Sequence, residues 1–279
     1  MKKVLIIILL LIILSFLIPR KKVESFTVSK GFELPPLAFK IDKIYAKLYD
    51  ITFDEKMLFD FDVSHIKPTL SKESMILDAG TGTGKYYKYF FKKHSIVGVD
   101  ASKEMLKIAQ TRCPLGTFVL GNLKNQDLFK NKEMTHVLCL LDTLYHNNYL
   151  TQAKILKNFY YWLKKGGLLF IHVFDKKKLL PMPRKYSKLY VDDYKNLHGY
   201  TELPDFNHDA FFIHKDDHVL FKEKYKMNAT GNIRNQTTKL YIPNDPKKTI
   251  AQILEVGFEM VNRYKLSKDS DIELLVFKK

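Results

Sequence analysis

Short apolar runs alternate with amphipathic stretches through the middle of the chain. The runs have the length of strands and end at turns: residues 75–79, 95–100, 116–121, 136–141 and 167–174. Helices are expected between them, at residues 84–93, after Ser102 and at 151–163. Ser102 is a typical N-cap, and Met105, Ile108 and Ala109 then share one helical face. Continuous apolar strands alternating with helices predict a parallel sheet covered on both faces.

The flanking segments follow other patterns. Residues 37–62 are expected to form a helical cap, because apolar residues from Ile41 to Leu48 recur at helical spacing. Residues 176–205 are basic, tyrosine-rich and interrupted by prolines, and no element is assigned there. The remaining elements expected are antiparallel strands within 209–243, a helix at 247–256, and strands at 258–266 and 271–278.

Residues 4–18 form an uninterrupted apolar run. As a helix it reaches roughly 22 Å, whereas the usual ~20 apolar residues of a full membrane span reach roughly 30 Å. Flanking lysines can snorkel to the membrane surface and make up the difference. A cleaved signal peptide is the alternative, although no small-x-small cleavage site follows and a basic cluster at 20–22 does. We expect an uncleaved single-pass membrane anchor, with the rest of the chain in the cytoplasm because slightly more basic residues follow the run than precede it.

The chain is strongly basic, with 46 basic against 30 acidic residues and a formal net charge of +16. Such a charge favours contact with an anionic surface, nucleic acid or an acidic substrate. A lysine-rich bias spread over a solvated surface explains the charge equally well, because lysines occur in every segment. The two cysteines do not make a disulfide framework, and Cys139 is expected to be a buried thiol because it lies in an apolar run.

A glycine-rich turn follows the first expected strand, in Ile76-Leu-Asp-Ala-Gly-Thr-Gly-Thr-Gly84. Glycines let a backbone approach a ligand closely, and the start of a helix offers free N–H groups. The dinucleotide fingerprint G-x-G-x-x-G would place its third glycine at position 85, where this chain has lysine. Asp78, just before the turn, suits an ammonium-bearing ligand better than a pyrophosphate, because like charges repel.

The D-x-G-x-G-x-G pattern resembles motif I of class I S-adenosylmethionine-dependent methyltransferases. The resemblance covers about residues 40–175 and 246–279, and it implies a Rossmann-like α/β fold with a seven-stranded, mostly parallel sheet, helices on both faces and an antiparallel last strand. We divide the chain into an anchor at 1–22, a tether and helical cap at 23–70, and a methyltransferase domain at 71–279. That domain includes an antiparallel β insert at about 176–245 on the substrate side.

The resemblance implies S-adenosylmethionine as cofactor and assigns residues around it. Asp100, which ends the second strand, matches the acidic residue that takes the ribose hydroxyls. Asn122 departs from the family's commoner aspartate near the adenine amino group, and Tyr49 matches an aromatic that lies over the cofactor, although core packing explains Tyr49 equally well. The full set of expected cofactor-binding residues is Tyr49, Asp78, Gly80, Thr81, Gly82, Gly84, Asp100, Ala101, Met105, Asn122, Leu123 and Leu141.

The segment Leu140-Leu-Asp-Thr-Leu-Tyr-His146 matches the family motif that lines the methyl-transfer site. His146 and Asp142 are the first candidates for a general base, and Tyr145 is the next. Lys164-Lys-Gly-Gly167 resembles the family's L-K-P-G-G, with lysine in place of proline, and is expected to stop the preceding helix. No metal site is expected, because His208, His214 and His218 lack a convincing zinc ligand set and are assigned to a hairpin surface.

The methyl acceptor is expected to be a small molecule or a lipid, because the anchor keeps the chain at a membrane and no RNA-binding module is added. The same cofactor site could serve an RNA or protein methyltransferase, or remain in a non-catalytic binding protein. A nucleotide-dependent oxidoreductase is disfavoured by the glycine spacing. Asn228 and Asn235 begin glycosylation sequons, so glycans on them in a eukaryotic host would place the domain in the lumen instead.

Overall fold

The computed structural model describes residues 41–53, 56–179, 188–193, 196–268 and 270–279. The membrane anchor expected at residues 4–18 lies outside this range. Within the described residues, no helix is both long and apolar enough to cross a membrane.

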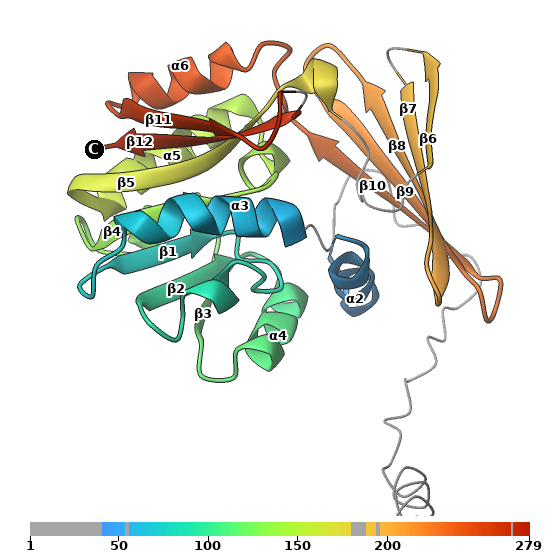
Figure 1. Cartoon of the computed structure of the whole chain (residues 1–279), viewed down its shortest axis with the longest axis horizontal. Helices are drawn as coiled ribbons and strands as arrows, with labels where there is room; N and C mark the ends of the chain where they lie inside the picture. Colours follow the sequence, from blue (N-terminus) through green and yellow to red (C-terminus); the bar gives the residue numbers. More distant parts are fainter. Residues whose placement is uncertain (1–40, 54–55, 180–187, 194–195, 269) are drawn as a thin grey trace, which may run out of the picture.

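Seven strands form the main sheet, in the order β11-β12-β5-β4-β1-β2-β3 (Figure 1). Five of them run parallel: β1 (Met75–Ala79), β2 (Ser95–Asp100), β3 (Thr117–Leu120), β4 (Met134–Cys139) and β5 (Leu163–Phe174). Strands β11 (Glu259–Lys265) and β12 (Ile272–Lys278) close the sheet antiparallel to their neighbours. The predicted seven-stranded, mostly parallel sheet is therefore confirmed, and its order reverses beside β1, where such sheets bind ligands.

Helices cover both faces, because neighbouring apolar residues of each strand point to opposite sides. Ile76, Leu138 and Phe170 pack with residues of α3 (Lys56–Ile66), which crosses one face in Figure 1. Leu77, Val137 and Leu169 belong to a second core that includes residues of α5 (Tyr149–Trp162). The remaining long helices are α4 (Lys103–Arg112), which follows β2, and α6 (Lys247–Glu255), which precedes β11.

The expected antiparallel insert is a separate five-stranded sheet, with the order β10-β9-β8-β7-β6. Its strands are β6 (Lys188–Asp193), β7 (Asn196–Glu202), β8 (Phe206–His214), β9 (Val219–Met227) and β10 (Ile233–Leu240). Helix α2 (Lys43–Thr52) lies between the two sheets in Figure 1, and its Tyr45 and Leu48 pack against Phe206, Tyr225 and Met227 of the insert. The apolar helical face expected from Ile41 to Leu48 therefore contacts the insert.

Three sequence expectations are wrong in detail. Residues 84–93 form turns and the 3-10 helix η2 (Tyr87–Tyr89) instead of a continuous α-helix, since the backbone there mixes i+3 with i+4 hydrogen bonds. Lys164–Gly167 lies inside β5 and is not a helix stop, since Leu163 already caps α5. His208 is fully buried rather than on a hairpin surface, because its strand position faces inward.

A buried hydrogen-bond network joins α3 to β5. The Nε2 atom of His172 lies 3.1 Å from Oδ1 of Asp62, and the Tyr86 hydroxyl donates to Oδ2 of the same carboxylate. The side chains of Asp62 and His172 are both 0% exposed. A carboxylate in such a place is tolerated only when hydrogen-bond donors surround it, so this network is the main polar link between α3 and the sheet.

Replacing Asp62 with alanine is expected to destabilise the protein by about 3–5 kcal/mol, because it leaves buried donors without their acceptor. The free energy of unfolding, measured by urea titration, checks this value. Asp60→Ala is the matched control, since Asp60 is on the same helix with a half-exposed side chain whose partners, Lys56 and the Tyr89 hydroxyl, make only exposed contacts with it. This variant should stay within about 0.5 kcal/mol of the parent. Equal losses in the two variants would contradict the assignment.

Candidate active site

The glycine-rich turn after β1 has a backbone that only glycine adopts without strain. Gly80, Gly82 and Gly84 have φ values of +74°, +53° and +74°. A Cβ atom at Gly80 would lie 2.3 Å from the side chain of Thr143, whereas one at Gly82 would meet nothing within 4 Å. Gly80 therefore lets the loop after β4 approach closely, and Gly82 leaves open space above the turn.

Asp78 is buried at the end of β1, and no cationic side chain among the described residues pairs with it. Burial raises the pKa of its carboxyl to about 7, the Thr81 hydroxyl opposes part of the rise by donating to Oδ2 at 2.6 Å, and Asp100 adds to the rise. A carboxylate held in this way is ready to bind a cation, because an ammonium group would relieve both the burial and the repulsion from Asp100.

Asp100 ends β2, and backbone amides hold its carboxylate in place. Oδ2 accepts from the Gly82 N–H at 2.9 Å, and Oδ1 accepts from the Ser102 N–H at 2.8 Å. Burial raises the pKa of Asp100, while these amides and the nearby His146 lower it. Each oxygen keeps acceptor capacity, so the carboxylate can bind two vicinal hydroxyl groups.

The residues expected around an adenine occupy the neighbouring loops. Ala101 is exposed, and Met105 is buried at the start of α4 under the Ser102 cap, as expected. Asn122 is exposed after β3, and its side-chain oxygen already accepts from the Lys124 N–H at 3.1 Å. Leu123 is buried, and its carbonyl accepts from Asn158 of α5 at 2.7 Å. The Asn122 side chain therefore stabilises its own turn, and its Oδ1 atom retains one lone pair for a ligand.

The loop after β4 brings His146 beside Asp142, with Nε2 and Oδ2 3.3 Å apart and about a third of each side chain exposed. Burial lowers the pKa of the His146 imidazole, but the Asp142 carboxylate outweighs that effect and raises it above its usual value. Leu141 has a positive φ of 54°, and its N–H donates to Nδ1 of His172 at 2.7 Å. Tyr145 is fully buried, with its hydroxyl 3.3 Å from the His172 carbonyl oxygen, so it supports the loop from within.

Helix α2 is fastened to this site by contacts that the sequence did not reveal. Arg112 of α4 pairs with Asp50 at 2.6 Å and donates to the Thr83 carbonyl, while Lys85 donates to the carbonyl oxygens of Asp50 and Phe53. The Tyr49 ring lies tilted against that of Phe53, with centroids 4.8 Å apart. Burial raises the pKa of the Tyr49 hydroxyl, and the carboxylates of Asp142 and Asp100 raise it further, so this hydroxyl is within electrostatic reach of the residues that follow β4 and end β2. The only sequence signal for this arrangement was a lysine where a nucleotide-binding glycine would stand.

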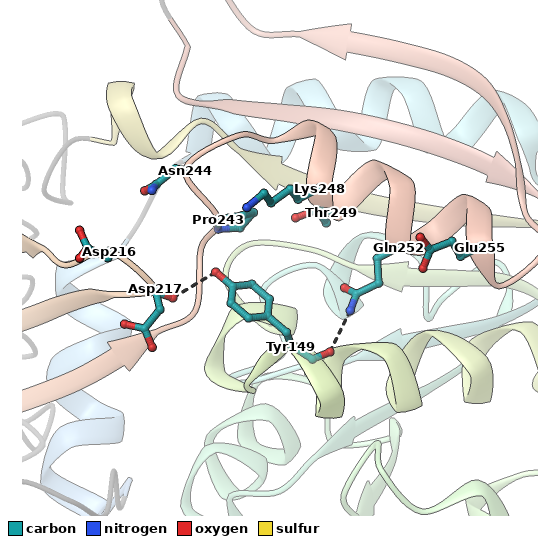
Figure 2. A pocket seen from close by; sticks show the side chains of 9 residues that line it. All are labelled: Tyr149, Asp216, Asp217, Pro243, Asn244, Lys248, Thr249, Gln252 and Glu255. Carbon is teal, nitrogen blue, oxygen red and sulfur yellow. Dashed lines mark hydrogen bonds between the residues drawn. The ribbon is translucent and has the colours of Figure 1, made fainter.

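A separate pocket of about 470 Å³ opens between α5, α6 and the β8–β9 turn (Figure 2). Tyr149 donates to the Asp217 carbonyl at 3.0 Å across it, and Gln252 donates to the Tyr149 carbonyl at 2.8 Å. None of the expected site residues lines this pocket. The candidate active site is thus the convergence of the β1, β2 and β4 ends under α2.

Comparison with known proteins assigns the class. Residues 76–167, which hold the glycine turn, Asp100 and the β4 loop, match the model of a methyltransferase domain. This match shows that residues 76–167 form a methyltransferase domain, whose cofactor is S-adenosylmethionine. A relative from Methanocaldococcus jannaschii, named uncharacterized protein MJ1123, is 32% identical over 154 residues, which are 53% of this chain and 70% of the relative.

Solved methyltransferase structures are similar to this chain over most of its length. The CcbJ methyltransferase of Streptomyces caelestis matches with a TM-score of 0.66 and 18% identity over 88% of this chain and 99% of its own. CalS10 of Micromonospora echinaspora, an amino pentose methyltransferase bound to S-adenosylmethionine, matches with a TM-score of 0.58 and 15% identity over 90% and 100%. At these identities the likeness shows the fold alone.

The residues of this site fit the cofactor. The glycine turn leaves open space at Gly82, the buried carboxyl of Asp78 favours a cationic group, and Asp100 keeps acceptor capacity for a diol. These are the needs of an amino acid end and a ribose, respectively.

Gly80→Ala is expected to lower stability by about 2–4 kcal/mol, because it combines a positive-φ penalty with a clash against Thr143. Gly82→Ala has the backbone penalty alone and should cost only about 1 kcal/mol. Thermal unfolding of both variants measures the difference, and Gly80→Ala/Thr143→Ala should recover part of the loss. Equal destabilisation at Gly80 and Gly82, with no recovery, would show that the loops are not in contact.

Proposed function

We propose that the protein transfers the methyl group of S-adenosylmethionine to a small-molecule acceptor, with the twelve residues expected from the sequence forming the cofactor site. The observation that carries the proposal is the convergence of Asp78, Asp100 and the Asp142–His146 pair at the carboxyl ends of adjacent strands, where the field of His146 reaches Asp100. Asp78 binds the ammonium group of the cofactor, Asp100 binds its ribose hydroxyls, and Tyr49 covers it. The sulfonium supplies an already activated methyl group.

The chain's own residues then position the acceptor and handle its proton. In-line placement of a nucleophile provides much of the rate enhancement without covalent help from the protein. His146 accepts the proton that the acceptor loses, and Asp142 orients the imidazole and stabilises the imidazolium. Tyr145 is placed as a positioning residue, because its hydroxyl contacts the backbone of His172 inside the core.

A small acceptor is favoured over an RNA or a protein substrate. The insert and α2 close over the β4 loop: Tyr241 donates its N–H to the Tyr145 carbonyl at 2.8 Å, and Phe53 packs edge-on to Phe221. CalS10, which has the same architecture, acts on an amino pentose. RNA recognition generally needs an exposed basic groove or stacking platform. Salt-independent activity on small molecules would support the proposal, and steeply salt-dependent RNA binding would favour the alternative.

Cofactor binding tests the site directly. Calorimetry with S-adenosylmethionine and S-adenosylhomocysteine should give micromolar affinity for the parent, and Asp100→Ala should weaken it at least tenfold because a charge-assisted bond to the diol is lost. Glu104→Ala is the control and should bind normally, because the Glu104 carboxylate on α4 pairs with Lys107. A folded parent that binds neither compound would remove the enzymatic assignment.

Asp78 makes cofactor binding depend on pH. Below its folded-state pKa of about 7 the carboxyl is protonated, so the dissociation constant should rise roughly tenfold per pH unit as pH falls further. That pKa lies above the value of about 3.9 in the unfolded chain, so ionisation of Asp78 destabilises the cofactor-free fold. The destabilisation is complete above about pH 7 and absent below about pH 4. Asp78→Asn should therefore bind the cofactor poorly at every pH, yet unfold at higher urea than the parent at about pH 8. A variant that is destabilised at that pH would contradict this sign.

His146→Gln should lower kcat at least about tenfold if the imidazole is the base. In the parent, the rate should rise with pH through a pKa above the usual ~6.5 of histidine, because only the neutral imidazole accepts a proton. In the variant, the rate should no longer rise with pH in this range, while the cofactor affinity should be unchanged. His94→Gln is the control, because His94 stands before β2, at the opposite end of the strands. An unchanged rate and pH profile in His146→Gln would remove His146 from catalysis.

We further propose that residues 4–18 anchor the protein in a membrane with the catalytic domain in the cytoplasm. The uninterrupted apolar run and the basic residues 20–22 support this. The full chain should sediment with membranes and resist carbonate extraction, whereas removal of residues 1–22 should release it. In a eukaryotic host, the exposed residues Asn228 and Asn235 should remain unglycosylated; glycans on them would place the domain in the lumen.

A further inference from the structure

The inner face of the insert carries buried polar side chains that the cofactor site does not use. Ten buried side-chain nitrogen or oxygen atoms in the described residues have no hydrogen-bond partner, and five of them belong to inward-facing positions of β8 and β10. These five atoms are His208 Nδ1, His214 Nε2, Arg234 Nε, Gln236 Oε1 and Thr238 Oγ1. Buried groups of this kind are normally paired, so a concentration of them on one face calls for a ligand.

Strand register places three of these groups around one carboxylate. On β9, Glu223 faces Gln236 of β10 on one side and the small Ala210 of β8 on the other. Thr238 lies one inward position further along β10 than Gln236, and His208 lies one inward position before Ala210. Gln236 therefore lies directly beside Glu223, while His208 and Thr238 lie diagonally from it in opposite directions along the sheet, and each of the three is at most 5% exposed.

Glu223 determines how His208 presents its other ring nitrogen. The hydroxyls of Tyr45 and Tyr225 donate to the Glu223 carboxylate at 2.7 and 2.6 Å, and Nε2 of His208 lies 3.1 Å from it. Because a carboxylate only accepts, the proton of His208 is on Nε2. In the neutral ring Nδ1 is then a hydrogen-bond acceptor, buried and without a partner among the described residues.

This polar face adjoins the methyl-transfer site. The ring of Phe53, at the end of α2, packs edge-on to both His208 and Phe221 and lies tilted against the Tyr49 ring, with the two centroids 4.8 Å apart. Burial raises the pKa of the Tyr49 hydroxyl, and so do the carboxylates of Asp142 and Asp100 and, more weakly, that of Glu223. Tyr49 and Phe53 therefore mark the boundary between the cofactor side and the insert side of one site.

We propose that His208 Nδ1, Gln236 Oε1 and Thr238 Oγ1 bind the non-reacting part of the methyl acceptor, which is a small molecule bearing several hydroxyl or amine hydrogen-bond donors. Glu223 is the positioning residue that fixes the acceptor role of His208. The inference rests on the proposed methyltransferase function and narrows its acceptor: an alkyl chain would leave these atoms unpaired, whereas a polyhydroxylated amine would satisfy them.

The probes are D-glucosamine, whose ring carries several hydroxyls, and cyclohexylamine, which has a six-membered ring and an amine but no hydroxyl. Both are titrated into the full chain loaded with S-adenosylhomocysteine, and methylation is followed with S-adenosylmethionine. Glucosamine should bind at least about tenfold more tightly than cyclohexylamine. Equal or tighter binding of cyclohexylamine, or no binding of glucosamine, overturns the inference, and methylation only of phosphatidylethanolamine vesicles would assign a lipid acceptor instead.

Two substitutions separate a recognition role from a structural one. Thr238→Val and Gln236→Met remove buried unpaired groups with little change of shape, so each should leave thermal stability equal to or above that of the parent. Each should also weaken glucosamine binding about tenfold and raise its KM without changing kcat. Thr237→Val is the matched control, because Thr237 lies on the opposite face of the same strand. Unchanged glucosamine binding in both inner-face variants overturns the proposal.

The cofactor affinity of the same samples keeps the two hypotheses apart. If the parent and all three variants bind S-adenosylhomocysteine normally and also bind glucosamine with equal affinity, the methyltransferase function stands and the polar face is structural. If the folded parent does not bind S-adenosylhomocysteine, the proposed function itself fails.

Discussion

The active-site loop after β4 depends on one buried chain of hydrogen bonds. His172 of β5 accepts from the N–H of Leu141 through Nδ1, and its Nε2 donates to Asp62 of α3. This arrangement fixes the tautomer of His172 and holds Leu141 in its positive-φ conformation. Asp142 and His146 follow directly, so their position relative to Asp100 is set by a helix on one face of the sheet and a strand within it. Breaking either hydrogen bond would leave buried polar groups unsatisfied, and this cost keeps the loop in one conformation.

A second chain of contacts joins the cofactor turn to the insert through α2. Lys85 and Arg112 hold Asp50 and the end of the helix from the cofactor side, while Tyr45 donates to Glu223 on the insert side. Asp42, the N-cap of the same helix, pairs with Arg234 of β10 at 3.0 Å. Ten residues of α2 thus bridge two sheets, and Tyr49 lies where the two halves of the site meet.

The electrostatics of the site contrast with those of the surface. The chain has a net charge of +16, yet the carboxylates of Asp78, Asp100, Asp142 and Glu223 lie in or beside the site. Burial raises the pKa of Asp78 and Asp100, so the glycine-rich turn favours a cationic ligand that can replace lost solvation. The surface lysines act over longer distances and are screened by salt, so they bear on encounter with anionic partners rather than on the chemistry.

The sequence by itself determined the strand–helix alternation, the glycine turn and the carboxylates that end β1 and β2, because these depend on apolar periodicity and on short motifs within one segment. It also placed Asp142 and His146 four residues apart, which is enough to pair them. Only the tertiary structure decided that Lys85, Arg112 and Asp50 meet, that Tyr86 donates to Asp62 in the core, and that His208 turns inward onto Glu223. Those outcomes depend on which distant surfaces pack together, and long-range burial overrides local propensity wherever a polar residue on one element finds its partner on another.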